Sequence, residues 1–325
     1  MNLTTNGEIL QDIKNGKERP WRKKKVKSGL LSESFNRLEM RKRAERTLNC
    51  ATFLKFVECR NDEYKKLIDA NFCRDRLCPM CNWRRSRKLQ QQIFQILHVA
   101  HQREPKMRFV FLTLTVKNVP GEKLGDTVTE MLKGFKALME LKEVDDFMHG
   151  YVRALEVTYN KGRDDFHPHI HVLLGMRSTY FSGGGYINHA RWQEMWQGLL
   201  KLDYPPIVHI KPIKKRSQGE VPVEAAMEVG KYVAKDADYI HEGNEALTDK
   251  VVSTFAKALK SRRLIGFGKL FRRIHRELNL MDVESKNVDL VSGNDAVCSC
   301  PLCASNLFEQ LYKWRIGINV YLGVD

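Results

Sequence analysis

The sequence lacks any apolar run of about 18 residues or more, the length that a membrane-spanning helix needs. No such helix is therefore expected. The first residues, Met1 to Gly7, also lack the apolar segment of a secretory signal peptide. The eight cysteines come without such a signal and fall in short clusters, which is not the pattern of a secreted disulfide framework. Together these absences favour a reducing, cytoplasmic setting.

Acidic residues are too few to balance the basic ones. The chain has 39 Asp and Glu against 55 Lys and Arg, a formal net charge of +16. A field of this sign concentrates polyanions, so nucleic acid is the expected partner. The alternative is a basic protein whose charge serves only solubility. The charge is grouped in four stretches, at 19–27, 84–88, 211–216 and 257–276.

The 325 residues are enough for two domains, or for one large domain with extensions. Residues 1–45 are basic with little apolar periodicity, and we expect a tail or a loosely packed helix there. Apolar and β-branched patterns predict strands over 108–116, 151–159, 169–174 and 207–213. Helical spacing predicts helices over 124–141, 190–202, 224–235 and, as a long basic region, 248–280.

One predicted strand contains three histidines at every second position. In His167-Pro168-His169-Ile170-His171 the side chains alternate between two faces, so the imidazoles share one face while Ile170 faces the other way. Neutral imidazoles two residues apart can hold a divalent cation on a rigid sheet. The alternative is a histidine-rich surface strand with no metal.

A cation held by two histidines needs a harder third ligand if it is to be Mg²⁺ or Mn²⁺, because both prefer oxygen. Glu156 is the candidate, because an antiparallel partner strand can place its carboxylate beside His169 or His171. His167 is the alternative third ligand, and a surface salt bridge is the alternative role for Glu156. The strand register, which decides between them, is not readable from the sequence.

The predicted helix at 224–235 carries Glu228, Tyr232 and Lys235, at helical spacings of four and three residues that place them on one face. A phenolate that attacks a phosphodiester forms a covalent phosphotyrosine, and a cation is needed to polarise the phosphate. Lys235 would lower the pKa of the phenol or neutralise phosphate charge. Tyr239 is a second candidate nucleophile. The alternative is a solvated carboxylate beside a half-buried ring.

Two cysteine clusters have the spacing of metal knuckles. Cys73, Cys78 and Cys81 supply three thiolates around a Cys-Pro-Met-Cys turn, one short of a tetrahedral zinc site. Cys59 is a candidate for the fourth ligand. The second cluster is another, because Cys300-Pro301-Leu302-Cys303, with Cys298 beside it, repeats the Cys-Pro-x-Cys form. Zinc would fix the start of the following helix, whose residues Arg84, Arg85, Arg87 and Lys88 are expected to contact DNA phosphates or base edges.

Taken in order, these motifs resemble a known family. Phe111-Leu112-Thr113-Leu114-Thr115, the Glu156 strand, His169-Ile170-His171 and Glu228…Tyr232-Val233-Ala234-Lys235-Asp236 follow one another as they do in rolling-circle plasmid replication initiators of the HUH endonuclease superfamily. The chain is most similar to the branch with a Cys-rich N-terminal segment and a single nucleophilic tyrosine. The similarity covers roughly residues 46–240.

The resemblance implies an α+β fold, with a nicking domain over 106–242 built on a central antiparallel sheet with flanking helices. Before it would come a zinc-knuckle region at 46–100, and after it a helical basic extension at 243–325. It implies His169 and His171 as metal ligands, Tyr232 as nucleophile, and Glu228 as the residue that directs water at termination. It also favours Cys50 as the fourth zinc ligand.

The activity that the resemblance implies is nicking of one strand at a plasmid double-strand origin, at a single-stranded or hairpin site. The 5′-phosphate would stay on tyrosine and the 3′-hydroxyl would prime the host polymerase. A host helicase is a further expected partner, and a homodimer is compatible with the sequence. The rival functions are an HUH transposase and a non-catalytic zinc-dependent DNA-binding regulator.

Overall fold

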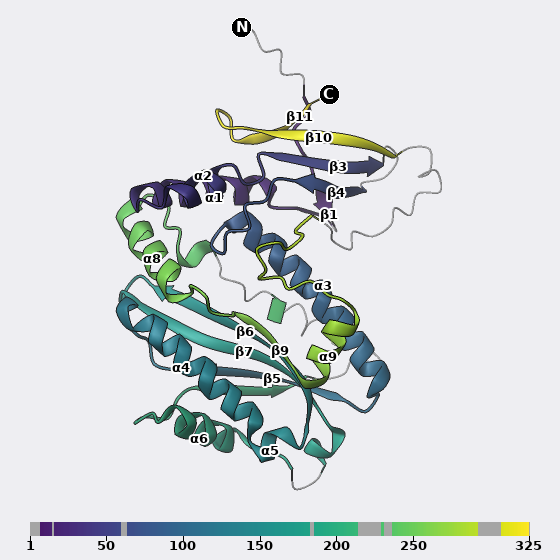
Figure 1. Cartoon of the computed structure of the whole chain (residues 1–325), viewed down its shortest axis with the longest axis vertical. Coiled ribbons are helices and arrows are strands. Elements are labelled where there is room, and N and C mark those ends of the chain that lie inside the picture. Colours follow the sequence, from purple (N-terminus) through teal and green to yellow (C-terminus); the bar gives the residue numbers. More distant parts are fainter. Residues whose placement is uncertain are drawn as a thin grey trace. The chain divides into compact units, whose positions relative to one another are not determined.

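The computed structural model describes residues 7–14, 16–59, 64–182, 185–213, 229–230, 236–291 and 307–324. The chain forms two compact units (Figure 1). Residues 1–85 and 286–325 make the first, called here the terminal unit, and residues 86–285 make the second, the central unit. Among the described residues, no helix combines the length and apolar character that crossing a bilayer requires.

The terminal unit joins the two ends of the chain in one sheet. Its four antiparallel strands are β3 (Phe53–Cys59), β4 (Lys65–Ala70), β10 (Leu307–Arg315) and β11 (Val320–Val324), in the order β11-β10-β3-β4. The C-terminal strand β10 thus pairs directly with β3 from the first sixty residues. A two-stranded ribbon of β1 (Ile13–Lys14) and β2 (Lys17–Glu18) precedes these strands, with helices α1 (Trp21–Arg37) and α2 (Arg41–Leu48).

The expectation of a basic tail or loosely packed helix over 1–45 is wrong for its second half. Helix α1 buries Trp21, Leu31 and Phe35, and α2 buries Ala44. The Trp21 indole donates a hydrogen bond to Asp12 at 2.7 Å, and its ring packs edge-on against Phe56 of β3. The basic residues between these apolar positions mask the periodicity, although the buried face is sufficient to hold the helix on the sheet.

The central unit is built on a five-stranded antiparallel sheet with the order β8-β5-β7-β6-β9. Its strands are β5 (Arg108–Thr115), β6 (Met148–Asn160), β7 (Asp165–Met176), β8 (Val208–Pro212) and β9 (Ile265–Gly268). The longer helices are α3 (Pro79–Arg103, of which residues 86–103 belong here), α4 (Gly121–Glu140), α6 (His189–Leu200), α8 (Glu245–Ala258) and α9 (Lys269–Glu277). Short turns of helix are α5 (Lys142–Asp145), η1 (Ser178–Phe181) and η2 (Asp236–Asp238).

Four predicted strands are confirmed as β5 to β8, and two predicted helices as α4 and α6. The expectation of a helical extension over 243–325 is wrong in two places. A strand, β9, interrupts the basic helical region and pairs with β6 as the edge of the central sheet. Residues 307–324 form the β10–β11 hairpin of the terminal unit. In both cases the strand is formed by pairing with residues that are distant in sequence, which local pattern does not report.

The two faces of the central sheet have different covers. On the face of His169 and His171, one apolar cluster joins α3, α9 and the strands, and includes Ala154 and Leu173. On the opposite face Phe135 of α4 packs edge-on against Tyr151 at 5.2 Å. The face that carries the histidines, called here the histidine face, is therefore partly covered by helices α3 and α9.

Candidate active site and metal centres

The pairing of β6 with β7 decides where Glu156 lies. In the antiparallel register Glu156 stands directly opposite His169, and Ala154 stands opposite His171. Residues opposite one another in a ladder project to the same face. Glu156, His169 and His171 therefore meet on the histidine face, in the central three strands of the sheet.

Three donor atoms converge there. The Nε2 atoms of His169 and His171 lie 2.9 and 3.1 Å from the same Glu156 oxygen, Oε2. Adjacent ligands of an octahedral ion with bonds of about 2.1 Å are separated by about 3.0 Å. Glu156 is only 2% exposed and His171 7%, so the ligand set is preorganised in a largely dry site. These distances fit one small hard cation.

The other ring nitrogens orient the imidazoles. His169 Nδ1 lies 3.1 Å from the backbone oxygen of His167, and this bond requires a proton on Nδ1. With Nδ1 protonated, the contact between Nε2 and the Glu156 carboxylate requires either a second proton on the ring or a metal cation between the two atoms. His171 Nδ1 lies 3.2 Å from the Thr113 hydroxyl on the neighbouring strand β5. Such outer contacts are usual behind histidine ligands of metals.

His167, the alternative third ligand, lies beside this group. Its ring centre is 5.2 Å from that of His169. Burial and the neighbouring His169 and Arg163 lower its pKa, so it is neutral near pH 7. In the part of the chain that the structure describes, the group whose donor atoms lie within 4.8 Å of one another consists of Glu156, His169 and His171.

Glu228, Tyr232 and Lys235 lie outside the described residues. Val229 and Gly230, which lie between Glu228 and Tyr232 in the sequence, are described and are helical. Val229 is fully buried in the cluster that holds Ala154 and Leu173, the same-face neighbours of Glu156 and His171. The backbone before Tyr232 is thus packed on the histidine face.

Gly230 is held against α3. Its carbonyl accepts a hydrogen bond from the Ser86 hydroxyl at 2.5 Å. A Cβ added at Gly230 would lie 2.3 Å from Gln90 Cγ and 3.2 Å from Gln90 Cα, so a larger residue there would have to displace the Gln90 side chain.

The chain beyond residue 235 returns to the end of the sheet nearest Glu156. The His241 ring packs edge-on against Tyr159 of β6 at 5.6 Å, three residues along the strand from Glu156 and therefore on the opposite face of the sheet. Tyr239, the second candidate nucleophile, is fully buried, with its ring 5.8 Å from that of Phe255. Burial of Tyr239 argues against its attack on a DNA strand.

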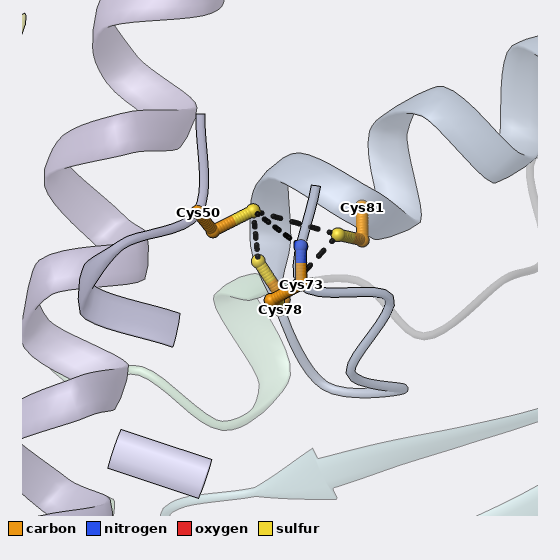
Figure 2. Close-up of side chains that lie close together, drawn as sticks. All are labelled: Cys50, Cys73, Cys78 and Cys81. Atoms are coloured by element: carbon orange, nitrogen blue, oxygen red, sulfur yellow. Dashed lines mark hydrogen bonds between the residues drawn. The ribbon is translucent and has the colours of Figure 1, made fainter. Parts of the chain in front are cut away.

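A second group of side chains that could hold a metal ion lies in the terminal unit. Cys50 follows α2, Cys73 follows β4, Cys78 immediately precedes α3, and Cys81 lies in the first turn of α3. Figure 2 shows the sulfurs of Cys50, Cys78 and Cys81 pointing toward a common centre, with Cys73 next to them. Their sulfur atoms all lie within 4.8 Å of one another. The structure thus brings Cys50 to the three thiols of the knuckle.

The sulfur separations fit a tetrahedral zinc site. Cys50 Sγ lies 3.6 Å from the sulfurs of both Cys78 and Cys81, and Cys73 Sγ lies 3.7 Å from that of Cys81. Four sulfurs about 2.3 Å from a central zinc are separated by about 3.8 Å. Backbone N–H groups of the Cys73 loop also point at sulfur, with Arg74 N 3.2 Å from Cys81 Sγ. Such donors stabilise thiolates.

The pKa values of the clustered thiols are shifted in different directions. Burial raises the pKa of the Cys50 and Cys81 thiols. Burial would also raise the pKa of Cys78, but hydrogen bonds from the other three thiols and from Ser28 outweigh it and lower that pKa well below its usual range. The Lys25 ammonium, only 4% exposed, donates to the backbone oxygens of Leu48 and Cys50 at 2.6 and 2.7 Å. Burial lowers its pKa, and the neighbouring cysteines oppose that shift.

The other candidates for the fourth thiol are placed differently. Cys59 is buried at the end of β3 and does not belong to the group of four. Cys298, Cys300 and Cys303 lie outside the described residues.

Comparison with known proteins assigns the chain to a family. A family model described as "Replication protein" matches residues 64–322, which contain the Glu-His-His group and three of the four clustered cysteines. The chain belongs to this family of replication proteins. Proteins named "Protein rep" are similar over most of their length: that of Bacillus amyloliquefaciens is 39% identical over 97% of both chains, and that of Streptococcus pneumoniae is 40% identical over 88% of both. No solved structure matches this replication protein.

The expectation that Arg84 and Arg85 of this replication protein contact DNA is wrong. Both side chains are buried, at 6% and 5% exposure. Arg84 donates to the backbone oxygens of Leu290 and Val291, and Arg85 to that of Asp75. Their guanidinium groups satisfy loop carbonyls around the cysteine cluster, because five fixed donors suit that task. Arg87 remains exposed.

Sequence reasoning missed several residues that support the two sites in this replication protein. Thr113 and Lys25 contact ligand candidates as described above, and Lys25 was hidden in a basic run. Asp75, between two cysteines, accepts two hydrogen bonds from Arg43 at 2.9 Å and one from its own loop at Leu77 N. The position of Asp75 between Cys73 and Cys78 in the sequence could have indicated that its carboxylate orders this loop.

Proposed function

We propose that this replication protein is a rolling-circle plasmid initiator that nicks one strand of double-strand origin DNA. The observation that carries the proposal is the convergence of two imidazole nitrogens on one Glu156 oxygen, on the sheet face where the backbone before Tyr232 packs. The family of replication proteins, the net charge of +16 and the motif order support it. The names of the relatives favour replication over the rival transposase.

His169, His171 and Glu156 would hold Mg²⁺ or Mn²⁺. A bound cation would polarise the scissile phosphate and stabilise the charge that develops on it. The carboxylate supplies the hard oxygen ligand, and the burial of the group limits competition by water. The contacts of His169 with the His167 backbone and of His171 with Thr113 would hold both rings in place.

Tyr232 would be the nucleophile. Its oxygen forms a bond to phosphorus while the bond from phosphorus to the 3′-oxygen breaks, so the 5′-phosphate stays on the protein and the 3′-oxygen takes up a proton. The phosphotyrosine conserves the energy of the diester for strand transfer. Lys235, three residues after the tyrosine in the sequence, would neutralise phosphate charge or favour the phenolate.

The ends of the segment 231–235 support this assignment. Val229 and Gly230 hold its start against α3 and the strand core, and His241 lies beside Tyr159, three residues from Glu156. Three residues of strand span about 10 Å. The ten residues 231–240 join these two anchors, and Tyr232, the second of them, follows closely on the anchor at the histidine face, where the cation would be held.

The metal ligands predict a specific loss of function. Glu156→Gln should bind Mn²⁺ at least about 10- to 100-fold more weakly, since loss of an outer partner alone has that effect. Calorimetric titration with Mn²⁺ measures the affinity, and cleavage of a labelled single-stranded origin oligonucleotide measures activity. Glu130→Gln, which changes an exposed carboxylate of α4 in the same unit, is the matched control. Unchanged Mn²⁺ affinity in Glu156→Gln would contradict the site.

Glu228 predicts a separable defect. It would act as general base for water at termination, where hydrolysis replaces a second covalent adduct. We expect Glu228→Ala to nick at a rate close to that of the parent and to terminate on the order of 10²-fold more slowly, the usual contribution of a general base. Replication of a two-origin plasmid measures termination, and oligonucleotide cleavage measures nicking. Equal losses of both would contradict the role.

Zn²⁺ held by Cys50, Cys73, Cys78 and Cys81 would have a structural role, because four thiols leave no open position for substrate. It would tie the loop after β4 to the start of α3 within the terminal unit. The host polymerase at the 3′-hydroxyl, a host helicase and a homodimer belong to the same proposal, which implies a cytoplasmic location. A non-catalytic zinc-dependent regulator is the rival, and a metal-dependent covalent adduct with DNA would exclude it.

A further inference from the structure

Helix α9 presents arginines on one side and apolar residues on the other. Leu270, Phe271 and Ile274 are buried in the cluster of the histidine face. Arg272, Arg273 and Arg276 are exposed. With 3.6 residues per turn, this spacing gives a basic outer face over an apolar inner one. The proposed nicking chemistry uses none of these arginines.

The helix is held close to the sheet. Phe271 lies over Gly150 of β6 and Gly175 of β7, where an added Cβ would come within 2.9 and 2.8 Å of its ring. The Lys269 ammonium donates to the backbone oxygens of Asp145 and Met148. The arginines of α9 therefore project from a fixed support, which lowers the entropy lost when they bind a ligand.

A cationic cavity opens beside this face. It has a volume of about 610 Å³, and its charged lining consists of Arg177, Lys269, Arg272, Arg273, Arg276 and one carboxylate, Glu104. A second cavity of about 470 Å³ shares Arg272 and Arg276 and adds Lys136, Arg153, Arg263 and one carboxylate, Asp282, which is ion-paired with Arg263. Basic side chains of α9, Arg272 and Arg276, thus line both cavities.

The potential in the first cavity is positive. Arg177, Arg273 and Arg276 have no carboxylate within ion-pair distance among the residues that the structure describes. His149, in the same lining, has a lowered pKa, first because of burial and also because of Arg177 and Lys269, against the opposing effect of Glu104. Unneutralised guanidinium groups on a fixed support suit phosphate, which they bind through paired donors.

The cavity and the Glu-His-His group lie toward opposite ends of one strand. Met148 lines the cavity, and Glu156 is eight residues further along β6. Eight residues of strand span about 26 Å. One DNA strand advances about 3.4 Å per nucleotide, so this span corresponds to about eight nucleotides. Phe271 packs on the same face of the sheet from which the two histidines project.

We propose that Arg177, Arg273 and Arg276 bind backbone phosphates of duplex DNA that flanks the nick site by about eight nucleotides. The placement of the nick rests on the proposed function; the binding of duplex phosphates does not. The surface would give affinity and register without reading bases. An anionic membrane is the rival ligand, but among the described residues next to α9 the exposed large apolar side chains are Leu278 and Met281, too few for insertion into lipid.

The test replaces Arg177, Arg273 and Arg276 together with Gln in the full chain. Binding to origin duplex without divalent metal is measured from 50 to 200 mM salt. We expect affinity at least about tenfold lower and a salt slope smaller by about 2 to 3, since each phosphate contact contributes about 0.9. Cleavage of a short single-stranded oligonucleotide with Mn²⁺ should be unchanged, and thermal unfolding should match that of the parent.

The matched control replaces Lys123, Lys133 and Lys257, three exposed lysines of α4 and α8, with Gln. It removes the same charge and should leave the slope within about 0.5 of the parent. Equal losses in both variants would reduce the effect to net charge and overturn the proposal. So would an unchanged slope in the arginine variant, or a loss of binding to phosphatidylglycerol vesicles with duplex binding intact. If the parent protein did not cleave the oligonucleotide, the nicking function would be refuted, and the proposal that the arginines bind duplex phosphates would still stand.

Discussion

Replacing Tyr232 with phenylalanine is expected to abolish the covalent adduct with origin DNA. The ring is retained and only the attacking oxygen is lost, so folding and DNA binding should persist. Removal of a nucleophile costs on the order of 10⁴- to 10⁶-fold in rate. The measurement is gel separation of protein linked to a labelled single-stranded origin oligonucleotide in the presence of Mn²⁺. Mass spectrometry of the crosslinked peptide then names the residue.

Tyr239→Phe is the matched control for this experiment. Tyr239 is fully buried, with its ring against that of Phe255. Its oxygen therefore has no access to a DNA strand. The control should form the adduct at close to the parent rate. An adduct in Tyr232→Phe, or a crosslinked peptide that contains Tyr239, would overturn the assignment of the nucleophile.

The second large effect is expected at the cysteine cluster. Cys78→Ser removes the thiol with the lowered pKa from a group whose four sulfurs are buried or half-buried. Structural zinc supplies about 10–16 kcal/mol of apparent binding free energy in small domains. We expect bound zinc to fall from about one per chain to none, and the terminal unit to lose cooperative unfolding. Zinc analysis and thermal unfolding measure both.

Cys59→Ser is the matched control, because Cys59 is equally buried but lies outside the group of four. It should keep its zinc and lose at most the stability of one packed thiol. Chelation of zinc from the parent should weaken binding to origin duplex more than cleavage of a preformed single strand. The opposite order would contradict a structural role, and zinc retained by Cys78→Ser would contradict the ligand set.

Local pattern was sufficient for the elements of the central unit. Strand alternation predicted that His169 and His171 share a face opposite Ile170, and the β7 register confirms it. The helices over α4 and α6 followed from apolar spacing in the same way. These predictions succeed because a side chain's direction depends on dihedral angles within a few residues.

Local pattern failed where distant segments pair or pack. Residues 307–324 form strands because β3, some 250 residues earlier, offers them an edge. Arg84 and Arg85 look like DNA contacts in the sequence, and only the folded loops around 75 and 290 show that they bind backbone oxygens. The helix α1 was masked in the same way by its basic residues.

By itself, the sequence determined the chemistry available to this protein: two imidazoles on one strand face, a knuckle of three thiols, a tyrosine spaced from a carboxylate and a lysine, and an excess of positive charge. The tertiary structure decided which carboxylate meets the imidazoles and which fourth thiol joins the knuckle, choosing Glu156 and Cys50. The physical reason is that strand register and loop closure depend on contacts between residues far apart in the chain, and a one-residue slip would turn Glu156 to the opposite face.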